Sequence, residues 1–350
     1  MSNKLSVVEA SKSSLIEYHS LRDTCGLLGL GERGRLCLTG VDRISFLHGQ
    51  ITQDIKSLCF GHGAFAALVD AKGKIQSDLN VYHLKDEILL DFERGYTQTI
   101  MQRLQQHLVS EDVEIVDPSE FYTLFSLQGP KSPQVVKNLF PDIAVPEKTW
   151  HFSEVDNGDG SVYICRRPRF GSDGFDLFVP ESIQEGLRLQ LMAGVELQGG
   201  SEVGQLASDL ARIQAGVPKM GVDMTSANLV QETGLTSSMI SFQKGCYIGQ
   251  EVISRIRTVG KVNKSLCRLS FESLPSSSGQ TNAALTVDGK EAGTVTSMAK
   301  IPGQNTQMVG LGYVKRAFLE DFDSLCLIGN EGSPVKVQIL GQPSTTGVSG

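Results

Sequence analysis

The segment 241–257 (S-F-Q-K-G-C-Y-I-G-Q-E-V-I-S-R-I-R) gathers more chemically distinctive residue types than any other part of the chain. After it begins, apolar residues recur at intervals of four, which predicts a helix. We expect Cys246 to lie in a turn just before that helix, where backbone N–H groups and Lys244 favour an anionic thiolate. The alternative is that Cys246 is a small buried apolar residue beside a turn. The surrounding motif consists of Lys244, Gly245, Tyr247, Gly249, Gln250 and Glu251.

The composition indicates a soluble globular protein with two or three domains in its 350 residues. Seven cysteines are scattered singly without C-x-x-C spacing, which favours reduced thiols and argues against a self-contained metal or iron–sulfur site. The chain has no run of 18 apolar residues, so no membrane helix is predicted, and the first residues lack the apolar core of a secretory signal. We therefore expect a cytoplasmic protein.

Positive charge is concentrated between residues 244 and 268, although the net charge of the chain is −7. This basic stretch can meet a polyanion such as a phosphate, a polyglutamate tail or RNA. The alternative is an ordinary solvated face. Its cations, against the single acid Glu251, are Lys244, Arg255, Arg257, Lys261, Lys264 and Arg268.

Hydrophobic periodicity predicts two α/β units in succession. The first has the order strand, helix after Asp42, three strands and a helix, and the second repeats the rhythm, which suggests a weak internal duplication. The last helix of the second unit should end at Gly216, with Pro218 beyond. Strands are predicted at 34–40, 64–71, 75–84, 87–93, 121–128, 162–165 and 175–179, and helices at 96–109, 132–140, 183–195 and 203–214.

From residue 259 onward the pattern changes to short strands without helical stretches, typical of a small antiparallel barrel or sandwich. The dipeptide Asp288-Gly289 predicts a tight hairpin between two of these strands. We expect the first 20 residues to be irregular and the tail after Gly341 to be disordered. The strands are predicted at 265–272, 285–287, 291–298, 309–314 and 334–340.

Polar residues on two predicted elements are candidates for ligand binding. Asp78 should share one strand face with Tyr82, where a carboxylate and a phenol can contact the donor edge of a flat heterocycle; the alternative is an ordinary solvent-facing position. Arg212, near the end of its helix, can bind a carboxylate or simply complement the helix dipole. Asn228 and Glu232 lie in a polar loop that can line a cleft or merely connect two elements.

The motif K-G-C-Y-I-G-Q-E (244–251) resembles the signature of the folate-binding YgfZ proteins, which are relatives of the glycine-cleavage T-protein, an aminomethyltransferase. Weaker similarities keep the same order along the chain, and include A-A-L-V-D-A-K-G-K-I-Q-S-D-L-N-V-Y (66–82) and A-R-I-Q-A-G-V-P (211–218). The other similar segments are 38–54, 127–130, 169–176, 228–232 and 309–316.

The resemblance implies an α+β fold in which two α/β units and a C-terminal β-barrel surround a hole that takes tetrahydrofolate. The expected folate-binding region is 20–257, with subdomains of about 20–120 and 121–257, and the expected barrel domain is 258–345. Asp78 would then contact the pterin and Arg212 the glutamate end, and no metal site is expected.

Departures from the T-protein pattern favour the YgfZ branch. Carboxylates of the T-protein are replaced here at Ser77, at about Ser172 and at Cys246, which argues against aminomethyl transfer. The resemblance implies instead a monomeric accessory factor for iron–sulfur enzymes, including those that thiolate tRNA, with Cys246 as its working thiol. A folate-dependent one-carbon transferase and a tRNA-interacting module that uses the basic stretch remain open alternatives.

Overall fold

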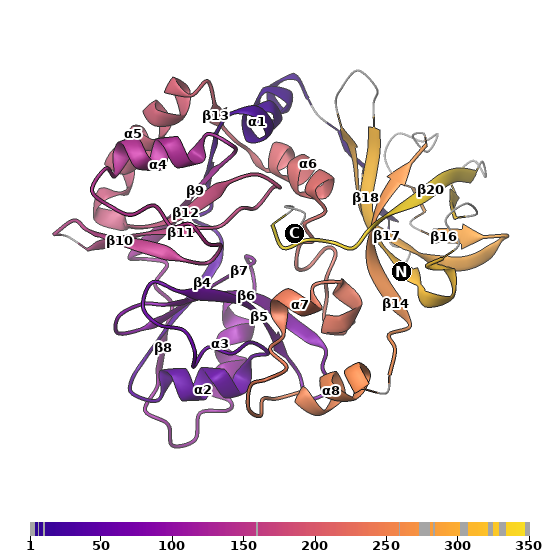
Figure 1. Ribbon diagram of the computed structural model, residues 1–350, viewed down its shortest axis with the longest axis horizontal. Coiled ribbons are helices and arrows are strands. Elements are labelled where there is room, and N and C mark those ends of the chain that lie inside the picture. The colour runs from indigo at the N-terminus through magenta and orange to yellow at the C-terminus, as the bar shows by residue number, and fades with distance from the viewer. Residues whose placement is uncertain are drawn as a thin grey trace.

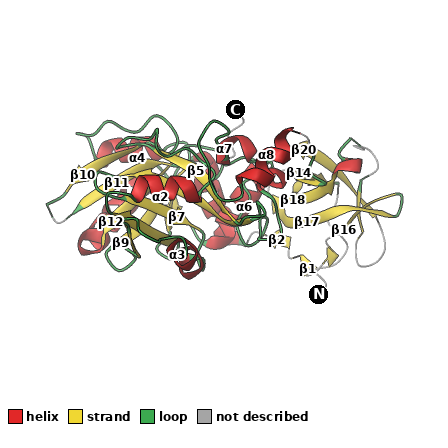
Figure 2. Ribbon diagram, turned by 90° about the horizontal axis from the view of Figure 1, so that it is seen from below, coloured by secondary structure: helices red, strands yellow, loops and turns green. Residues whose placement is uncertain are grey.

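The structure of the chain is a computed structural model that describes residues 4–5, 7–9, 11–158, 160–258, 260–272, 281–282, 284–301, 307–320, 325–328 and 334–346. Two α/β units lie side by side, and a β-barrel lies at the other end of the long axis (Figure 1). The segment between the second unit and the barrel carries the short helices α7 and α8 (Figure 1). Viewed from below, the strands of the two units overlap, and the barrel lies apart from them along the long axis (Figure 2).

The first unit is a five-stranded sheet with the order β5-β6-β7-β4-β8. Two helices cover the face of this sheet that points away from the second unit (Figure 1), with Leu36, Leu47, Leu79, Leu90 and Ile100 among the buried residues. Asp42 precedes the first helix as predicted, but its carboxylate accepts the N–H of Asp112 rather than capping the helix. The elements are β4 (Gly34–Thr39), α2 (Arg43–Gln50), β5 (Gly63–Val69), β6 (Ile75–His83), β7 (Ile88–Phe92), α3 (Thr97–Gln105) and β8 (Glu114–Val116).

The second unit is a six-stranded sheet with the order β10-β11-β12-β9-β3-β13. It repeats the first: strand, helix, three strands, helix, strand, with the four strands β10-β11-β12-β9 arranged as β5-β6-β7-β4 are. The suspected duplication is therefore visible in the topology. The elements are β9 (Tyr122–Gln128), α4 (Ser132–Leu139), β10 (Phe152–Asp156), β11 (Ser161–Arg166), β12 (Gly174–Pro180), α5 (Gln184–Leu197), β13 (Ser201–Glu202) and, from earlier in the chain, β3 (Gly26–Gly29).

The C-terminal strands form a closed six-stranded antiparallel barrel, which confirms the predicted C-terminal β-barrel. The hairpin at Asp288-Gly289 has φ values of 49° and 75°, as a type I′ turn needs. The order is β16-β19-β20-β14-β18-β17, closed by pairing of β16 with β17. The bounds are β14 (Lys264–Phe271), β16 (Ala284–Val287), β17 (Lys290–Ile301), β18 (Gln307–Lys315), β19 (Cys326–Ile328) and β20 (Pro334–Gly341).

Three helices join the second unit to the barrel. The helix α6 (Gln205–Ala215) ends as predicted at Gly216, which has a left-handed φ of 76°. The helices α7 (Thr236–Met239) and α8 (Gln250–Thr258) follow. No helix among the described residues is long and apolar enough to cross a bilayer.

The prediction of an irregular first 20 residues is wrong for residues 12–20, and residues 1–3, 6 and 10 lie outside the described residues. Residues 12–23 form the helix α1 (Lys12–Asp23), which begins with a capping box between Ser11 and Ser14. Its residues Tyr18 and Leu21 pack in one apolar cluster with Leu210 of α6. The other N-terminal elements are β1 (Lys4–Leu5), paired with β15 (Thr281–Asn282), and β2 (Val7–Glu9), which adds in parallel to β17.

The prediction of a disordered tail is also wrong for residues 342–346. The N–H of Ser344 donates to the carbonyl of Gly216 at 3.0 Å, and the carbonyl of Thr346 accepts the N–H of Gly171 at 2.8 Å. The carbonyl of Thr345 accepts from Arg167 Nη1 at 3.0 Å. The tail therefore returns from the barrel toward the centre of the molecule (Figure 1), through backbone hydrogen bonds that composition does not reveal.

Candidate functional site

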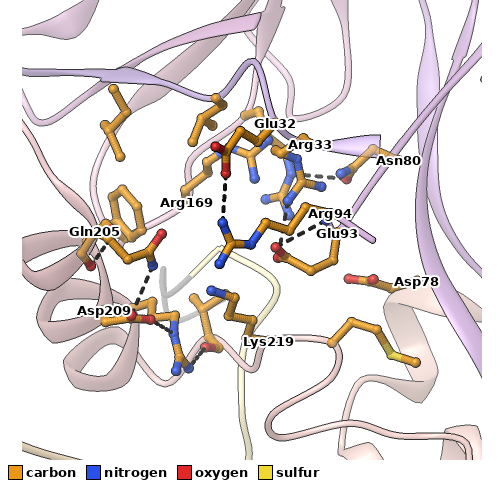
Figure 3. A pocket seen from close by; sticks show the side chains of 18 of the residues that line it. Glu32, Arg33, Asp78, Asn80, Glu93, Arg94, Arg169, Gln205, Asp209 and Lys219 are labelled. Carbon is orange, nitrogen blue, oxygen red and sulfur yellow. Dashed lines mark hydrogen bonds and ion pairs between the residues drawn. The ribbon is translucent and has the colours of Figure 1, made fainter. Parts of the chain in front are cut away.

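A cavity of about 190 Å³ lies where the two units meet α6. Its wall comes from the turn before β4, the strand β6, the end of β7, the loop 167–170, and α6 with the segment after it. Figure 3 shows charged side chains of both signs around it. The charged residues of the wall are Glu32, Arg33, Asp78, Glu93, Arg94, Arg167, Arg169, Asp209, Arg212 and Lys219.

Asp78 is the carboxylate of this wall that is left without a partner. It extends from β6 into the cavity (Figure 3), and its Oδ1 is enclosed but accepts no hydrogen bond from any described residue. Burial, with the nearby charge of Glu93 acting in the same direction, raises the pKa of Asp78 to about 6, although Arg33 opposes the rise. An unpaired carboxyl in a cavity can accept from a ligand that presents two N–H donors.

Behind Asp78, a charge network built on two fully buried carboxylates, Asp91 and Asp176, holds the wall in place. Asp91 accepts two hydrogen bonds from Arg33, at 2.7 and 2.9 Å, and one from Asn80 at 2.8 Å. Arg169 approaches Asp91 at 3.6 Å and pairs with Asp176 at 2.6 Å. Burial alone would raise the pKa of Asp91, but Arg33 and then Arg169 outweigh it, so the pKa stays below its ordinary value. The network joins β6, β7 and β12 into one rigid cavity wall.

The cations of the wall differ in how far they are already paired. Arg212 donates to Asp209 at 2.6 Å and to Asp223 at 2.8 Å, so two carboxylates already pair with its guanidinium. Arg94 pairs with Glu32 at 2.7 Å, but both side chains are exposed, so solvent screens the pair. Lys219 makes no ion pair with any described residue and points into the cavity (Figure 3). Lys219 is therefore the cation most available to an anionic ligand group.

The family model named GCVT N-terminal domain matches residues 7–244. The chain belongs to this family. A crystal structure of the glycine cleavage system aminomethyltransferase T from Bartonella henselae superposes with a TM-score of 0.81 at 19% identity, over 96% of this chain and 89% of that one. The closed barrel and the mixed sheets are thus an aminomethyltransferase-like fold.

Relatives identified by sequence carry transferase names. A protein of Arabidopsis thaliana with the name "putative transferase, chloroplastic" is 32% identical over 83% of this chain, which spans 65% of that protein's length. An aminomethyltransferase of Lysinibacillus sphaericus is 25% identical over 93% of this chain and 85% of its own length.

Within this family fold, Lys244 has a structural role that the sequence did not indicate. Its ammonium is buried and donates to the carbonyls of His48, Ile51 and Gln53 at 2.5–3.0 Å, and it lies 4.8 Å from the ring centre of Tyr247. Burial lowers the pKa of Lys244 to about 8. The prediction that Lys244 favours an anion beside the cysteine is wrong, because its donors are used by these carbonyls at the end of α2.

We expect Lys244→Met to destabilise the protein by about 2–4 kcal/mol, because three buried carbonyls lose their shared donor. Urea unfolding of this variant beside Lys261→Met, which removes an exposed ammonium, measures the difference. Equal unfolding midpoints for the two variants would show that the three carbonyls find other donors at no cost.

Cys246 lies in an exposed segment with no regular structure, so the alternative of a buried apolar cysteine is wrong. The helix α8 begins only at Gln250, after the turn at Gly249, whose φ is 83° and where a Cβ would lie 2.5 Å from the carbonyl oxygen of Asp70. Cys246 is not part of the cavity wall. The structure thus places the motif thiol on the surface and Asp78 in the cavity, as two separate sites.

The other predicted ligand residues divide in the same way. Arg212 joins Asp78 at the cavity. Tyr82 instead lies fully buried between the sheets, with its ring against Phe178. Asn228 and Glu232 are buried in a loop, where Glu232 accepts from Asn228 and from the N–H of Leu229. These three residues are not in the cavity wall. Tyr82 extends from the same face of β6 as Asp78, but it lies farther along the strand, where the second sheet covers that face. The packing of the loop turns Asn228 and Glu232 toward the core.

The basic stretch does not form one continuous face. Lys244 is buried, and Arg268 packs against Gly216 and donates to the carbonyl of Gln214 at 3.4 Å. Arg255, Arg257 and Lys261 remain exposed on and just after α8, and Arg257 lies over the ring of Phe242 at 4.0 Å. Lys264 is half-buried, and its ammonium lies 4.5 Å from the ring centre of Tyr313. Three of the six cations thus remain exposed to a polyanion.

Sequence reasoning missed most of the cations that surround the cavity, including Arg33, Arg94, Arg169 and Lys219. They come from four separate loops or strand ends, so no local spacing connects them. Only Lys219 among these four cations had a local sequence signal, because it directly follows Pro218, just after the predicted helix end at Gly216.

Residues 342–346 should protect the loop at the cavity wall from solvent. If the chain ends after Gly341, the N–H of Gly171 loses the carbonyl of Thr346, and Arg167 loses that of Thr345. We expect amide hydrogen exchange of residues 169–173 to become at least about tenfold faster, while exchange in β12 stays unchanged. Unchanged exchange at Gly171 would contradict the tail's part in ordering this loop.

Proposed function

We propose that the central cavity binds tetrahydrofolate, with the pterin against Asp78. The observation that carries this proposal is the enclosed Oδ1 of Asp78 without a hydrogen-bond partner. A reduced pterin presents an amino group and a ring N–H side by side, and a carboxylate can accept from both. When bound, this cofactor would supply a nitrogen that carries one-carbon units.

At the other end of the ligand, the glutamate carboxylates need cations. Lys219 supports this role because it has no ion-pair partner among the described residues, and Arg94 because its pair with Glu32 is exposed and easily exchanged. The assignment of this role to Arg212 has less support, because Asp209 and Asp223 already accept from its guanidinium.

The finer proposal is that the chain is a YgfZ-type accessory factor for iron–sulfur enzymes of the cytoplasm, including tRNA-thiolating ones. Its support is the exposed Cys246 within K-G-C-Y-I-G-Q-E. A thiol on the surface can reach a partner protein, whereas a thiol inside the cavity would face the folate. Arg255, Arg257 and Lys261 are the residues for a contact with tRNA, and the free chain is proposed to be a monomer.

The test separates folate binding from the thiol. Tetrahydrofolate binding is measured by calorimetry for the wild type, for Cys246→Ser and for the control Cys59→Ser, which alters another exposed cysteine. The activity of an iron–sulfur enzyme is then measured in cells that lack the protein and carry each variant. We expect all three to bind equally and Cys246→Ser alone to fail in cells. Equal rescue by both variants would reject the thiol role, and no binding by the wild type would reject the folate proposal.

A folate-dependent aminomethyl or other one-carbon transferase is the second candidate, favoured by one observation. A carboxyl with a pKa of about 6 in a cavity can give and take a proton near neutral pH. Transfer of a one-carbon unit to tetrahydrofolate by the wild type would support it, if Asp78→Asn lacks the transfer even at tetrahydrofolate concentrations that saturate this variant. No turnover with aminomethyl or methyl donors, despite folate binding, would leave the accessory role.

A further inference from the structure

A second cavity, of about 280 Å³, lies between the two sheets and is separate from the folate candidate site. Its wall comes from β4, β7 and the segment around β8 on one side, and from β9, β11 and β12 on the other. The two charged residues in this wall are Arg35 and Glu87. The others are Cys37, Thr39, Leu84, Leu89, Val116, Pro118, Phe121, Tyr122, Tyr163 and Phe178.

Arg35 is an unusual residue for such a place. It is only 1% exposed, because alternation along β4 turns it to the face between the sheets, together with Cys37. Its Nη2 donates to the carbonyl of Gly31 at 3.0 Å, but Nε and Nη1 have no acceptor among the described residues. Each buried donor left unpaired costs about 1–3 kcal/mol, so these two require an explanation.

The acids near Arg35 do not satisfy these donors. Asp117, next to the wall residues Val116 and Pro118, is exposed and accepts the N–H of Ser119 at 3.0 Å. Asp91, its cross-strand partner, accepts from Arg33 and Asn80. Glu87 shares the cavity wall but makes no ion pair with Arg35 in the described structure. The unpartnered donors of Arg35 therefore remain for a group inside the cavity.

We propose that this cavity binds a small organic acid with an apolar body, such as a medium-chain or aromatic carboxylate, whose carboxylate accepts from Arg35. An apolar wall with a few polar groups is typical of small-molecule sites. Arginine suits carboxylates, and an apolar cavity of only about 150 Å³ already holds a benzene ring. The apolar body would lie against Leu89 and Phe178, and Val116 and Phe121, which are 38% and 64% exposed, mark the opening.

The test uses octanoate as the probe and octanamide as its neutral counterpart, with the full chain and no folate present. Calorimetry should give octanoate binding with a dissociation constant below about 1 mM, and at least about tenfold weaker binding of octanamide. Saturating tetrahydrofolate should leave octanoate binding unchanged, because the two cavities are separate. This result does not depend on whether the folate proposal holds.

Three variants assign the site. Arg35→Met should weaken octanoate binding by about 10- to 150-fold, the range for a hydrogen bond to a charged group. Glu87→Gln should tighten it a few-fold, because a like charge leaves the wall. Val116→Trp should block the opening and abolish binding while Arg35 is intact, which keeps the test valid if Arg35→Met does not fold.

Three results would each overturn the proposal. They are no octanoate binding at about 1 mM, equal binding of octanoate and octanamide, and full binding by Val116→Trp. Competition between octanoate and tetrahydrofolate would place octanoate in the central cavity and would also overturn it.

Discussion

Asp78→Asn should weaken tetrahydrofolate binding by at least about 100-fold in calorimetry at pH 8. The asparagine keeps the shape of the side chain but replaces one acceptor oxygen with an NH₂ group, which would face the donors of the pterin. Two hydrogen bonds to a charged group, each worth about 1.5–3 kcal/mol, are then lost or opposed. Asp86→Asn, which alters an exposed acid in the turn between β6 and β7, is the matched control.

The same substitution should make the empty protein more stable above pH 6. The pKa of Asp78 is raised to about 6 in the folded protein, so the folded state holds this proton more tightly than the unfolded state does. Wild-type stability therefore falls as pH rises from about 4 to 6, where unfolded and folded chains differ in protonation. Asparagine cannot ionise, so Asp78→Asn should gain about 1–2 kcal/mol relative to wild type at pH 8, and nothing at pH 3.

Urea unfolding at pH 3 and pH 8 measures this difference. A variant that is more stable and binds no folate is the expected signature of a carboxylate kept for a ligand. Undiminished folate binding by Asp78→Asn would place the pterin elsewhere, and a loss of stability at pH 8 would show that Asp78 has an unseen partner.

Asp91→Asn should destabilise the protein by about 3–5 kcal/mol, the largest stability effect that we expect from a single substitution. It removes the charge that accepts two hydrogen bonds from Arg33 and leaves this largely buried guanidinium with the longer, 3.5 Å contact to Glu93 as its ion pair. Because the pKa of Asp91 is held below its ordinary value, the wild-type advantage is present above about pH 4 and is lost as pH falls through the folded pKa. The exposed Asp142→Asn is the control.

A double variant distinguishes the ion pair from the volume of its side chains. Replacing both partners, as Arg33→Met with Asp91→Leu, should recover at least half of the lost free energy of unfolding, because both charges of the pair leave together. Glu93 then loses its 3.5 Å contact with Arg33 but keeps access to solvent. A double variant as unstable as Asp91→Asn would show that Asn80 and Arg169, rather than Arg33, depend on Asp91.

The order and type of most elements follow from the sequence alone. The strands β4, β5, β6, β7, β9, β11 and β12 and most barrel strands have local patterns, whereas the short β8 and the exposed β10 were not predicted. Glycine marks the end of a helix at Gly216 and a hairpin turn at Asp288-Gly289. These signals are local, because they depend on the pitch of a helix or the pleat of a strand. The helix α1 was missed because its residues form no strong apolar stripe, and serines alone mark its start.

The partners of the charged side chains were decided only by the tertiary structure. Lys244 binds carbonyls almost two hundred residues earlier in the chain, Arg212 pairs with Asp223 across a turn, and residues 342–346 return to Arg167. The sequence could therefore name Asp78 and Cys246 as distinctive residues. It could not place one inside a cavity and the other on the surface, because a side chain is free or paired according to segments that only folding brings together.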